Sequence, residues 1–202
     1  MRVCIQRASV AFIAVLALSV RPGAAEEERP IETFEDRPET RWEFIADTVM
    51  GGVSTGRVGF LTEDGTAFAR MTGTVSTENN GGFIQFRTRL DAPPPDGTGG
   101  VRLIVRGNDQ RYFVHLRTTG TLLPWQYYQA GFEATPDWTE VRLPLADFAR
   151  SGWPLAEVPA PGSLTSVAIV AFGRDHAAEI EVREVGFYRM PGPDALDPSP
   201  VR

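Results

Sequence analysis

Apolar and polar side chains alternate along several short stretches of this chain, and that period of two predicts β-strands. The three clearest stretches are residues 83–90, 101–106 and 112–117. In the first of them Ile84 and Phe86 are apolar, while the residues after each are polar or charged. Successive side chains of a strand point to opposite faces of its sheet, so each stretch is expected to have one face on a core.

Further strands are expected where β-branched and aromatic residues cluster between turn signals. These segments are residues 31–34, 58–61, 67–75, 125–133, 139–143, 166–172 and 179–188. After residue 25 no helical stripe persists for three turns, and residues 145–150 are expected to form at most one short turn. About ten short strands with turns between them predict an all-β, two-sheet sandwich.

The first 25 residues have the three parts of a secretory signal peptide. Arg2 and Arg7 precede a thirteen-residue apolar run at 8–20, and small residues follow as far as Ala25. This run is shorter than the roughly 20 residues that cross a hydrocarbon core. Cleavage before Glu26 is therefore expected, with a retained anchor as the alternative. The mature domain would be periplasmic or secreted, with no integral membrane segment after cleavage.

Cleavage would change the composition in ways that bear on function. It removes Cys4, the single cysteine, so the mature domain would have no disulfide, thiol nucleophile or cysteine metal site. It also removes three arginines and no acidic residue, which changes the net charge from −6 to −9. Such an acidic domain is not expected to bind nucleic acid. Residues 26–190 are expected to form one domain and residues 191–202 a disordered, proline-rich tail.

Four motifs follow one another along the chain. The first joins Arg41-Trp42 to the run DTVMGGVS at 47–54, and the others are STENNGGF at 76–83, RGNDQRY at 106–112 and WTEVRLPLADF at 138–148. Together they resemble the motifs of the complex I intermediate-associated protein 30 family, with this chain as an exported bacterial member. The resemblance implies a galactose-binding-like jelly roll without catalytic activity. Mitochondrial members assemble respiratory complex I, but export would separate this chain from that process, so the partner stays open.

The loop at 47–54 is a candidate site. The loop could bind a ligand or a cation through a carboxylate and backbone carbonyls, and the residues that suit this role are Asp47, Met50, Gly51 and Gly52. The favoured interpretation is a tight strand connection with Met50 tucked into the core, because glycine pairs are ordinary in turns. A calcium ion held by loop carbonyls with Asp47 or Asp175 is an alternative, but the sequence does not establish whether a metal binds.

The second glycine-rich loop and the two histidines also have both a structural and a functional interpretation. Asn79 and Asn80 are candidate ligand contacts, but Asn side chains commonly stabilise turns by bonding their own backbone. Neither His115 nor His176 has a serine or carboxylate at the spacing of a catalytic triad. Asp175 and His176 together are more typical of a surface turn than of a metal site. No catalytic residue is assigned, although a glycosidase-like carboxylate pair, distant in sequence, stays open as a third alternative.

The alternating strands also predict a basic face. If Ile84, Leu103 and Val114 point to the core, polar side chains of the same strands gather on the opposite face. These are Gln85, Arg87, Arg89, Arg102, Arg106, His115 and Arg117, with Trp125 and Tyr127 joining from the next strand. Planar guanidinium groups beside aromatic rings suit carboxylate, phosphate or sugar recognition. The alternative is a solvated face whose arginines pair with acids such as Glu140.

The sequence thus predicts a non-catalytic, exported binding module without a cofactor. The first hypothesis is a chaperone-like or assembly factor that holds a protein partner. The alternative is a carbohydrate-binding module that uses the arginine and aromatic face for a glycan. Exposed rings at Trp125, Tyr127 or Trp153 would favour the glycan, and buried rings would oppose it.

Overall fold

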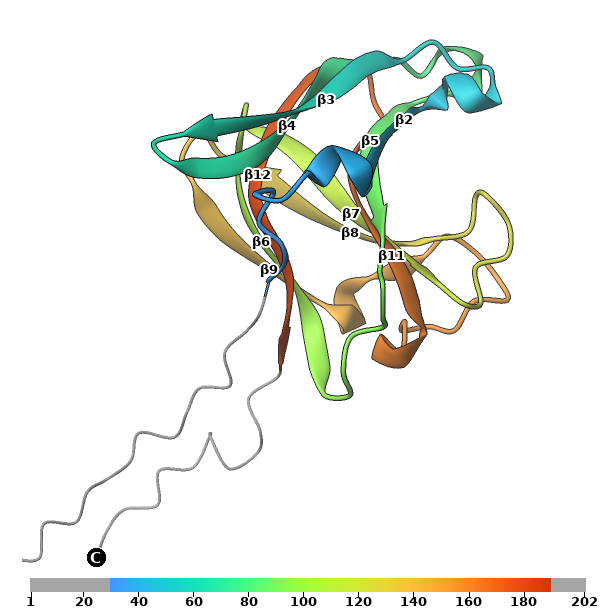
Figure 1. Ribbon diagram of the computed structural model, residues 1–202. Helices are drawn as coiled ribbons and strands as arrows, with labels where there is room; N and C mark the ends of the chain where they lie inside the picture. Colours follow the sequence, from blue (N-terminus) through green and yellow to red (C-terminus); the bar gives the residue numbers. More distant parts are fainter. Residues whose placement is uncertain (1–29, 190–202) are drawn as a thin grey trace, which may run out of the picture.

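The computed structural model describes residues 30–189, which form two antiparallel sheets packed face to face (Figure 1). The expected signal peptide and the expected tail lie outside these residues. Each sheet is named here by its central strand. The β12 sheet has the order β3-β4-β12-β6-β9, with β1 also paired to β12, and the β11 sheet has the order β10-β8-β7-β11-β5-β2.

The strands are short and are joined by turns. The β12 sheet comprises β1 (Pro30–Glu32), β3 (Thr55–Glu63), β4 (Thr66–Val75), β6 (Thr98–Gly107), β9 (Thr139–Pro144) and β12 (His176–Arg189). The β11 sheet comprises β2 (Trp42–Ala46), β5 (Phe83–Arg89), β7 (Gln110–Thr118), β8 (Tyr128–Ala134), β10 (Ala149–Arg150) and β11 (Leu164–Phe172). Single 3-10 turns connect them at η1 (Pro38–Thr40), η2 (Asp47–Met50), η3 (Glu78–Asn80), η4 (Leu145–Asp147) and η5 (Pro161–Ser163).

Each of the ten expected strands coincides with an observed one, and two observed strands, β2 and β10, were not expected. The turn expected at 145–150 is η4 followed by β10. The segment expected as a strand at 125–133 begins only at Tyr128, because residues 123–126 form a turn closed by the Gln126 N–H bonding the Leu123 carbonyl. That difference matters, since it moves Trp125 out of the sheet and into a loop.

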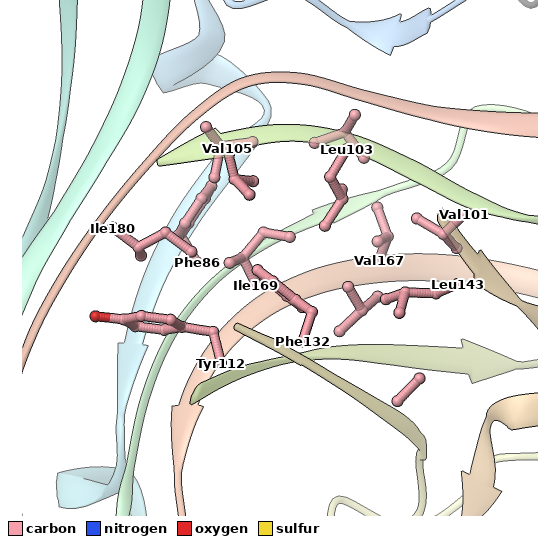
Figure 2. Packing of buried hydrophobic residues seen from close by; sticks show 14 of the residues in the cluster. Phe86, Val101, Leu103, Val105, Tyr112, Phe132, Leu143, Val167, Ile169 and Ile180 are labelled. Carbon is pink, nitrogen blue, oxygen red and sulfur yellow. The ribbon is translucent and has the colours of Figure 1, made fainter. Parts of the chain in front are cut away.

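The core lies between the two sheets and follows the predicted alternation. Ile84, Phe86, Leu103 and Val114 are all completely buried. Figure 2 shows side chains of both sheets meeting there, among them Phe86 and Ile169 of the β11 sheet and Leu103 of the β12 sheet. Burial of these apolar surfaces is the main stabilising contribution to such a sandwich.

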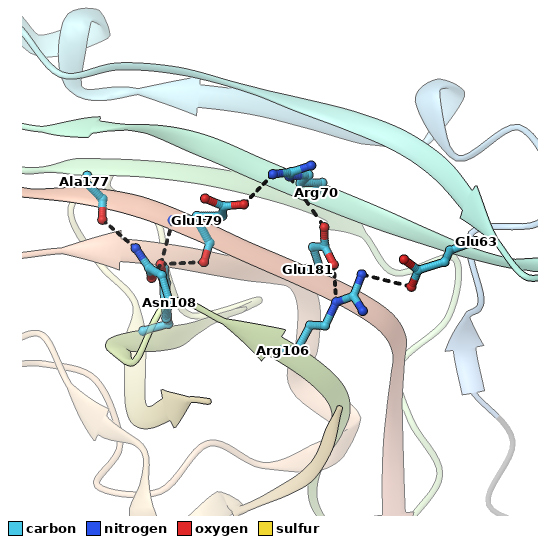
Figure 3. Close-up of polar contacts among 8 residues, drawn as sticks. Glu63, Arg70, Arg106, Asn108, Ala177, Glu179 and Glu181 are labelled. Carbon is cyan, nitrogen blue, oxygen red and sulfur yellow. Dashed lines mark hydrogen bonds and ion pairs between the residues drawn. The ribbon is translucent and has the colours of Figure 1, made fainter. Parts of the chain in front are cut away.

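The motif at 106–112 has a structural role. The Tyr112 hydroxyl lies 2.6 Å from Asn108 Oδ1 and 3.0 Å from the Glu179 carbonyl, and it accepts a hydrogen bond from the Glu179 N–H. Asn108 also donates to the Ala177 carbonyl, as Figure 3 shows. Burial raises the pKa of Tyr112 to about 12, so this hydroxyl stays protonated. These bonds fasten the β6–β7 turn to β12.

Candidate functional site: a groove on the β11 sheet

The arginines expected on one face lie on two different sheets. Arg87, His115 and Arg117 do share the outer face of the β11 sheet, because β5 and β7 both pair with β11. Arg102 and Arg106 lie instead on β6, which pairs with β12 and β9. The expectation of a single face is therefore wrong for these two residues. Period two identifies which side of a strand is polar, but it does not say which sheet the strand joins.

Arg102 and Arg106 belong to a network of ion pairs on the outer face of the β12 sheet. Arg106 binds Glu181 and lies 3.0 Å from Glu63, and Figure 3 shows Glu181 also meeting Arg70. Arg102 pairs with Glu140 at 2.8 Å. The alternative of arginines paired to acids such as Glu140 is thus correct for this sheet.

Trp138 adds a ring to that network. The Arg106 guanidinium lies 4.6 Å from the Trp138 ring centre, and that of Arg183 lies 4.2 Å from it. Burial lowers the pKa of Arg106, but the carboxylates of Glu181 and Glu63 outweigh this and raise it. The Arg106 guanidinium is therefore already paired with carboxylates and packed on an aromatic ring. The candidate site is on the β11 sheet instead.

A groove of about 950 Å³ crosses the outer face of the β11 sheet. Its lining residues come from β2, β5, β7 and β11 and from the loops beside them: Glu43, Ile45, Val49, Met50, Phe83, Gln85, Arg87, His115, Arg117, Pro124, Trp125, Tyr127, Ser151, Ser166, Ala168 and Phe172. The central strand β11 supplies the small side chains Ser166 and Ala168, and longer side chains of β5 and β7 stand on both sides of them. This difference in side-chain length makes the hollow.

The strand register places the arginines of this face in two neighbouring rows, and Gln85 in the row before them. In one row Glu43, Arg87, Ala168 and His115 follow one another across four strands, and in the next Ser166 stands between Arg89 and Arg117. Glu43 is bonded to Arg87. Each of the two arginine rows thus has a cationic side chain next to a small residue of β11.

Aromatic side chains form one wall of the groove. The rings of His115 and Tyr127 are stacked, with centroids 4.1 Å apart and planes 7° from parallel, and Phe172 packs edge-on against both. Trp125 follows on the adjoining loop with 63% of its surface exposed. By contrast Trp153, which is 87% exposed, is not among the lining residues.

His115 is uncharged at neutral pH. Burial lowers its pKa to about 4, although a hydrogen bond of 2.7 Å between its Nε2 and the Gln129 side chain acts in the opposite direction. His115 is only 8% exposed and its ring is stacked on that of Tyr127, so the half-buried Tyr127 ring presents the flat surface here and the imidazole beneath it adds no positive charge. The aromatic wall therefore suits an uncharged, flat part of a ligand.

The loop that carries Trp125 is held in place by polar contacts. Arg117 Nη2 donates to the Leu123 carbonyl at 2.8 Å. The Gln126 side-chain oxygen accepts hydrogen bonds from the N–H groups of Leu122 and Leu123, and Gln126 itself is buried. These contacts fix the loop without strand pairing, which is why the alternation of the sequence did not reveal it.

Asp47 is a structural clamp rather than a free ligand. Its buried carboxylate accepts hydrogen bonds from the N–H and hydroxyl groups of Ser54, at 2.9 and 2.5 Å, and from the N–H groups of Gly82 and Phe83, at 2.6 and 3.3 Å. Burial opposes its ionisation, but these donors together lower the pKa of Asp47. With four donors on its oxygens, Asp47 has its bonding capacity taken up within the fold.

The glycines of both loops make room for this carboxylate. A Cβ atom on Gly52 would lie 2.3 Å from Asp47 Cγ, and one on Gly81 would lie 2.4 Å from Asp47 Oδ2. Gly51 ends η2 with a left-handed backbone, at φ 90°. The hydrogen bond from Gly82 to Asp47 joins residues 35 positions apart in the sequence. The motifs at 47–54 and 76–83 therefore form a single packed unit at the edge of the groove.

Met50 lies outside the core, so the expectation that it is buried there is wrong. η2 turns Val49 and Met50 outward, with 72% and 57% of their surfaces exposed, and both line the groove. Asn79 and Asn80 are exposed and have left-handed backbones, with φ of 56° and 58°. Asparagine tolerates that conformation well, which accounts for both residues in the turn.

Asp175 and His176 lie at a turn and at the start of β12. Asp175 Oδ1 accepts hydrogen bonds from the N–H and hydroxyl groups of Thr77, at 2.7 and 2.8 Å, and these bonds lower its pKa. Across residues 30–189 no three His, Cys, Asp or Glu side chains are grouped so that they could hold a metal ion. In the same residues no helix is long and apolar enough to cross a bilayer.

The fold defines a class of proteins, the jelly-roll-like β-sandwiches that include carbohydrate-binding modules. The chain superposes on the family 11 carbohydrate-binding module of Clostridium thermocellum, solved with a β-1,3-1,4-mixed-linked tetrasaccharide. The TM-score is 0.65 at 9% identity, over 80% of this chain and 95% of the module. For the family 30 module of the cellulosomal cellulase Cel9D-Cel44B of that organism the TM-score is 0.50 at 12% identity, over 70% and 92%. The predicted all-β jelly-roll sandwich is confirmed.

The chain belongs to the complex I intermediate-associated protein 30 family, whose sequence pattern matches residues 32–181. This confirms the family indicated by the four motifs. No curated protein matches the chain in sequence. It is thus a β-sandwich domain of this family with the fold of carbohydrate-binding modules.

Proposed function

We propose that the protein is a non-catalytic, exported binding module that takes a stretch of a carbohydrate chain into the groove on the β11 sheet. The observation that carries this proposal is the aromatic wall: the exposed ring of Trp125 beside the stacked rings of Tyr127 and His115. Flat rings pack well against the apolar faces of sugar rings. The proposed setting, the periplasm or the outside of the cell, rests on the signal-like segment 1–25.

The polar side chains of the groove complement this wall. Gln85 offers both a donor and acceptors, and Arg87 offers the guanidinium donors that it does not use for Glu43; both kinds of group suit sugar hydroxyls. They lie in neighbouring rows of β5, across β11 from the aromatic wall. A few placed polar groups beside a mainly apolar surface are typical of small-molecule sites.

The groove is better suited to binding than to hydrolysis. Glycosidases use two carboxyl groups that flank the scissile bond, about 5–10 Å apart. Among the residues that line the groove Glu43 is the single carboxylate, and it is bonded to Arg87. His115, although present, is neutral and is bonded to Gln129 instead of to a nucleophile.

A protein partner is the second candidate. Val49 and Met50 on one side of the groove are exposed and apolar. Leu122, on the loop that carries Trp125, is also apolar, with 82% of its surface exposed. Exposed apolar side chains of this kind are common where proteins associate. The family name also refers to association with an intermediate of complex I. In this second candidate function the protein holds a protein partner in the groove, as an assembly factor or chaperone does.

Affinity gel electrophoresis through a panel of soluble neutral and acidic polysaccharides tests the proposal. We expect at least one polysaccharide to retard the protein in proportion to its concentration in the gel. As a control, the protein is also run in gels that contain the same polysaccharide and enough urea to unfold it. In those gels it should not be retarded. Migration unaffected by every polysaccharide would overturn the carbohydrate proposal and favour the protein partner.

A further inference from the structure

Three arginines gather around two small residues of β11. Ala168 stands beside Arg87, and Ser166 stands between Arg89 on β5 and Arg117 on β7. Ser166, Ala168, Arg87 and Arg117 all line the groove. Arg89 is exposed, stands outside that lining and shares a row with Ser166. Serine and alanine are short, so no large side chain of β11 separates the two arginines of β5 from Arg117 on β7.

The positive charge of this cluster is not balanced within the described chain. Glu43 pairs with Arg87, but over residues 30–189 neither Arg89 nor Arg117 has an ion pair with a carboxylate. Arg117 donates to the carbonyls of Thr121 and Leu123. Burial and then the charges of Arg87 and Arg89 lower the pKa of Arg117, as expected where neighbouring cations repel it. On the β12 sheet, in contrast, Arg70, Arg102 and Arg106 all have glutamate partners.

The Ser166 hydroxyl is a second, independent observation. Its residue is 5% exposed and lines the groove between the two arginines. Its oxygen is buried and has no hydrogen-bond partner among the described residues. Buried hydroxyl groups are nearly always bonded, so one without a partner points to a ligand atom or a water in this place.

We propose that the groove prefers an acidic saccharide, and that Arg89, Arg117 and Ser166 bind its carboxylate or sulfate group. Guanidinium groups bind such groups with paired, charge-assisted hydrogen bonds. The aromatic wall lies one row away: Ser166 and Ala168 are two residues apart, about 7 Å along a strand. A sugar ring stacked on Tyr127, which itself packs on His115, would thus bring its acidic substituent towards the cluster. This inference rests on the proposed function, since it names the class of carbohydrate.

Isothermal titration calorimetry with three oligosaccharides of equal length tests the inference. They are a neutral mixed-linkage β-glucan, a polygalacturonate and a sulfated galactan. We expect tighter binding of one or both acidic chains, with an affinity that falls as the salt concentration rises. The two acidic probes distinguish a carboxylate from a sulfate. Binding of the neutral chain at least as tight as that of both acidic chains would overturn this inference and leave the proposed function intact. Binding of none would overturn this inference, and the proposed function as well if no polysaccharide of the gel panel retards the protein.

Substitutions locate the anion. Arg89→Ala and Arg117→Gln are each expected to weaken binding of the acidic chain about tenfold and to reduce its salt dependence, because each removes one cation. Arg117→Gln keeps a polar side chain at this position without the charge, and circular dichroism reports whether each variant retains the fold. Arg57→Ala is the matched control, since Arg57 is an exposed arginine on the β12 sheet. Equal losses in Arg57→Ala and Arg89→Ala would contradict a local site.

Discussion

Replacing Asp47 by asparagine is expected to lower the free energy of unfolding by about 3 kcal/mol. The carboxylate accepts four hydrogen bonds from Ser54, Gly82 and Phe83, and an amide presents a donor to some of the same N–H groups. Those groups are then buried without an acceptor. Urea denaturation measures the change. Asp36→Asn, at an exposed carboxylate, is the control and should alter stability by about 0.5 kcal/mol or less.

The same carboxylate makes stability depend on pH. Its folded-state pKa lies below the ordinary value of 3.8, so the unfolded chain binds the proton more readily. The contribution of Asp47 is therefore complete well above pH 3.8 and is lost as the pH falls through 3.8 towards the folded-state pKa. The stability of the native chain should approach that of Asp47→Asn in this range. A difference between them that stays constant from pH 7 to pH 3 would contradict the clamp.

Trp125→Ala is expected to reduce the affinity for a retained oligosaccharide about fiftyfold. Covering about 100 Å² of ring surface contributes about 2.5 kcal/mol at 25 cal/mol per Å², and each 1.4 kcal/mol is a factor of ten. Isothermal titration calorimetry measures the loss. The change should not unfold the chain, because 63% of the Trp125 surface is exposed.

Trp153→Ala is the matched control for Trp125→Ala. Trp153 is more exposed than Trp125, at 87%, but it is absent from the residues that line the groove. Its removal should leave the affinity within about twofold of the native value, a change of about 0.4 kcal/mol. If the two variants lose affinity equally, stacking on the groove wall does not explain binding.

The sequence predicted the strands and their buried sides well, because each is a local property. Alternation at Ile84 and Phe86 directly reports which side of β5 meets the core. The alternation around Arg87 is the same as that around Arg106, yet Arg87 lies on the β11 sheet and Arg106 on the β12 sheet. Which sheet a strand joins depends on pairing between distant segments, and a period of two does not encode it.

Loop geometry was equally hidden from the pattern. Met50 was expected in the core as an apolar residue before two glycines, but the clamp at Asp47 fixes η2 so that Met50 faces outward. Trp125 was expected as the first residue of a strand over 125–133, and a loop held by Gln126 and Arg117 carries it instead. In both places a buried polar side chain fixes the backbone, and its partners become known only once the chain is folded.

The two glycine-rich motifs gain a physical explanation from this clamp. Gly52 and Gly81 leave space that a Cβ atom would take from the Asp47 carboxylate. The clamp sets η2 at the rim of the groove, where Val49 and Met50 line it. These family motifs thus shape the candidate site although they supply few of its polar contacts.

The central claim is that the groove on the β11 sheet is the binding site. Its most direct test is a titration of the ¹⁵N-labelled protein with a retained oligosaccharide, followed by amide and indole shifts in NMR spectra. The account predicts saturable shifts at the Trp125 indole and at the amides of Tyr127, His115 and Ser166, with those of Arg102 and Arg106 unmoved. Saturable shifts confined to the β12 sheet around Arg102 and Arg106 would contradict it.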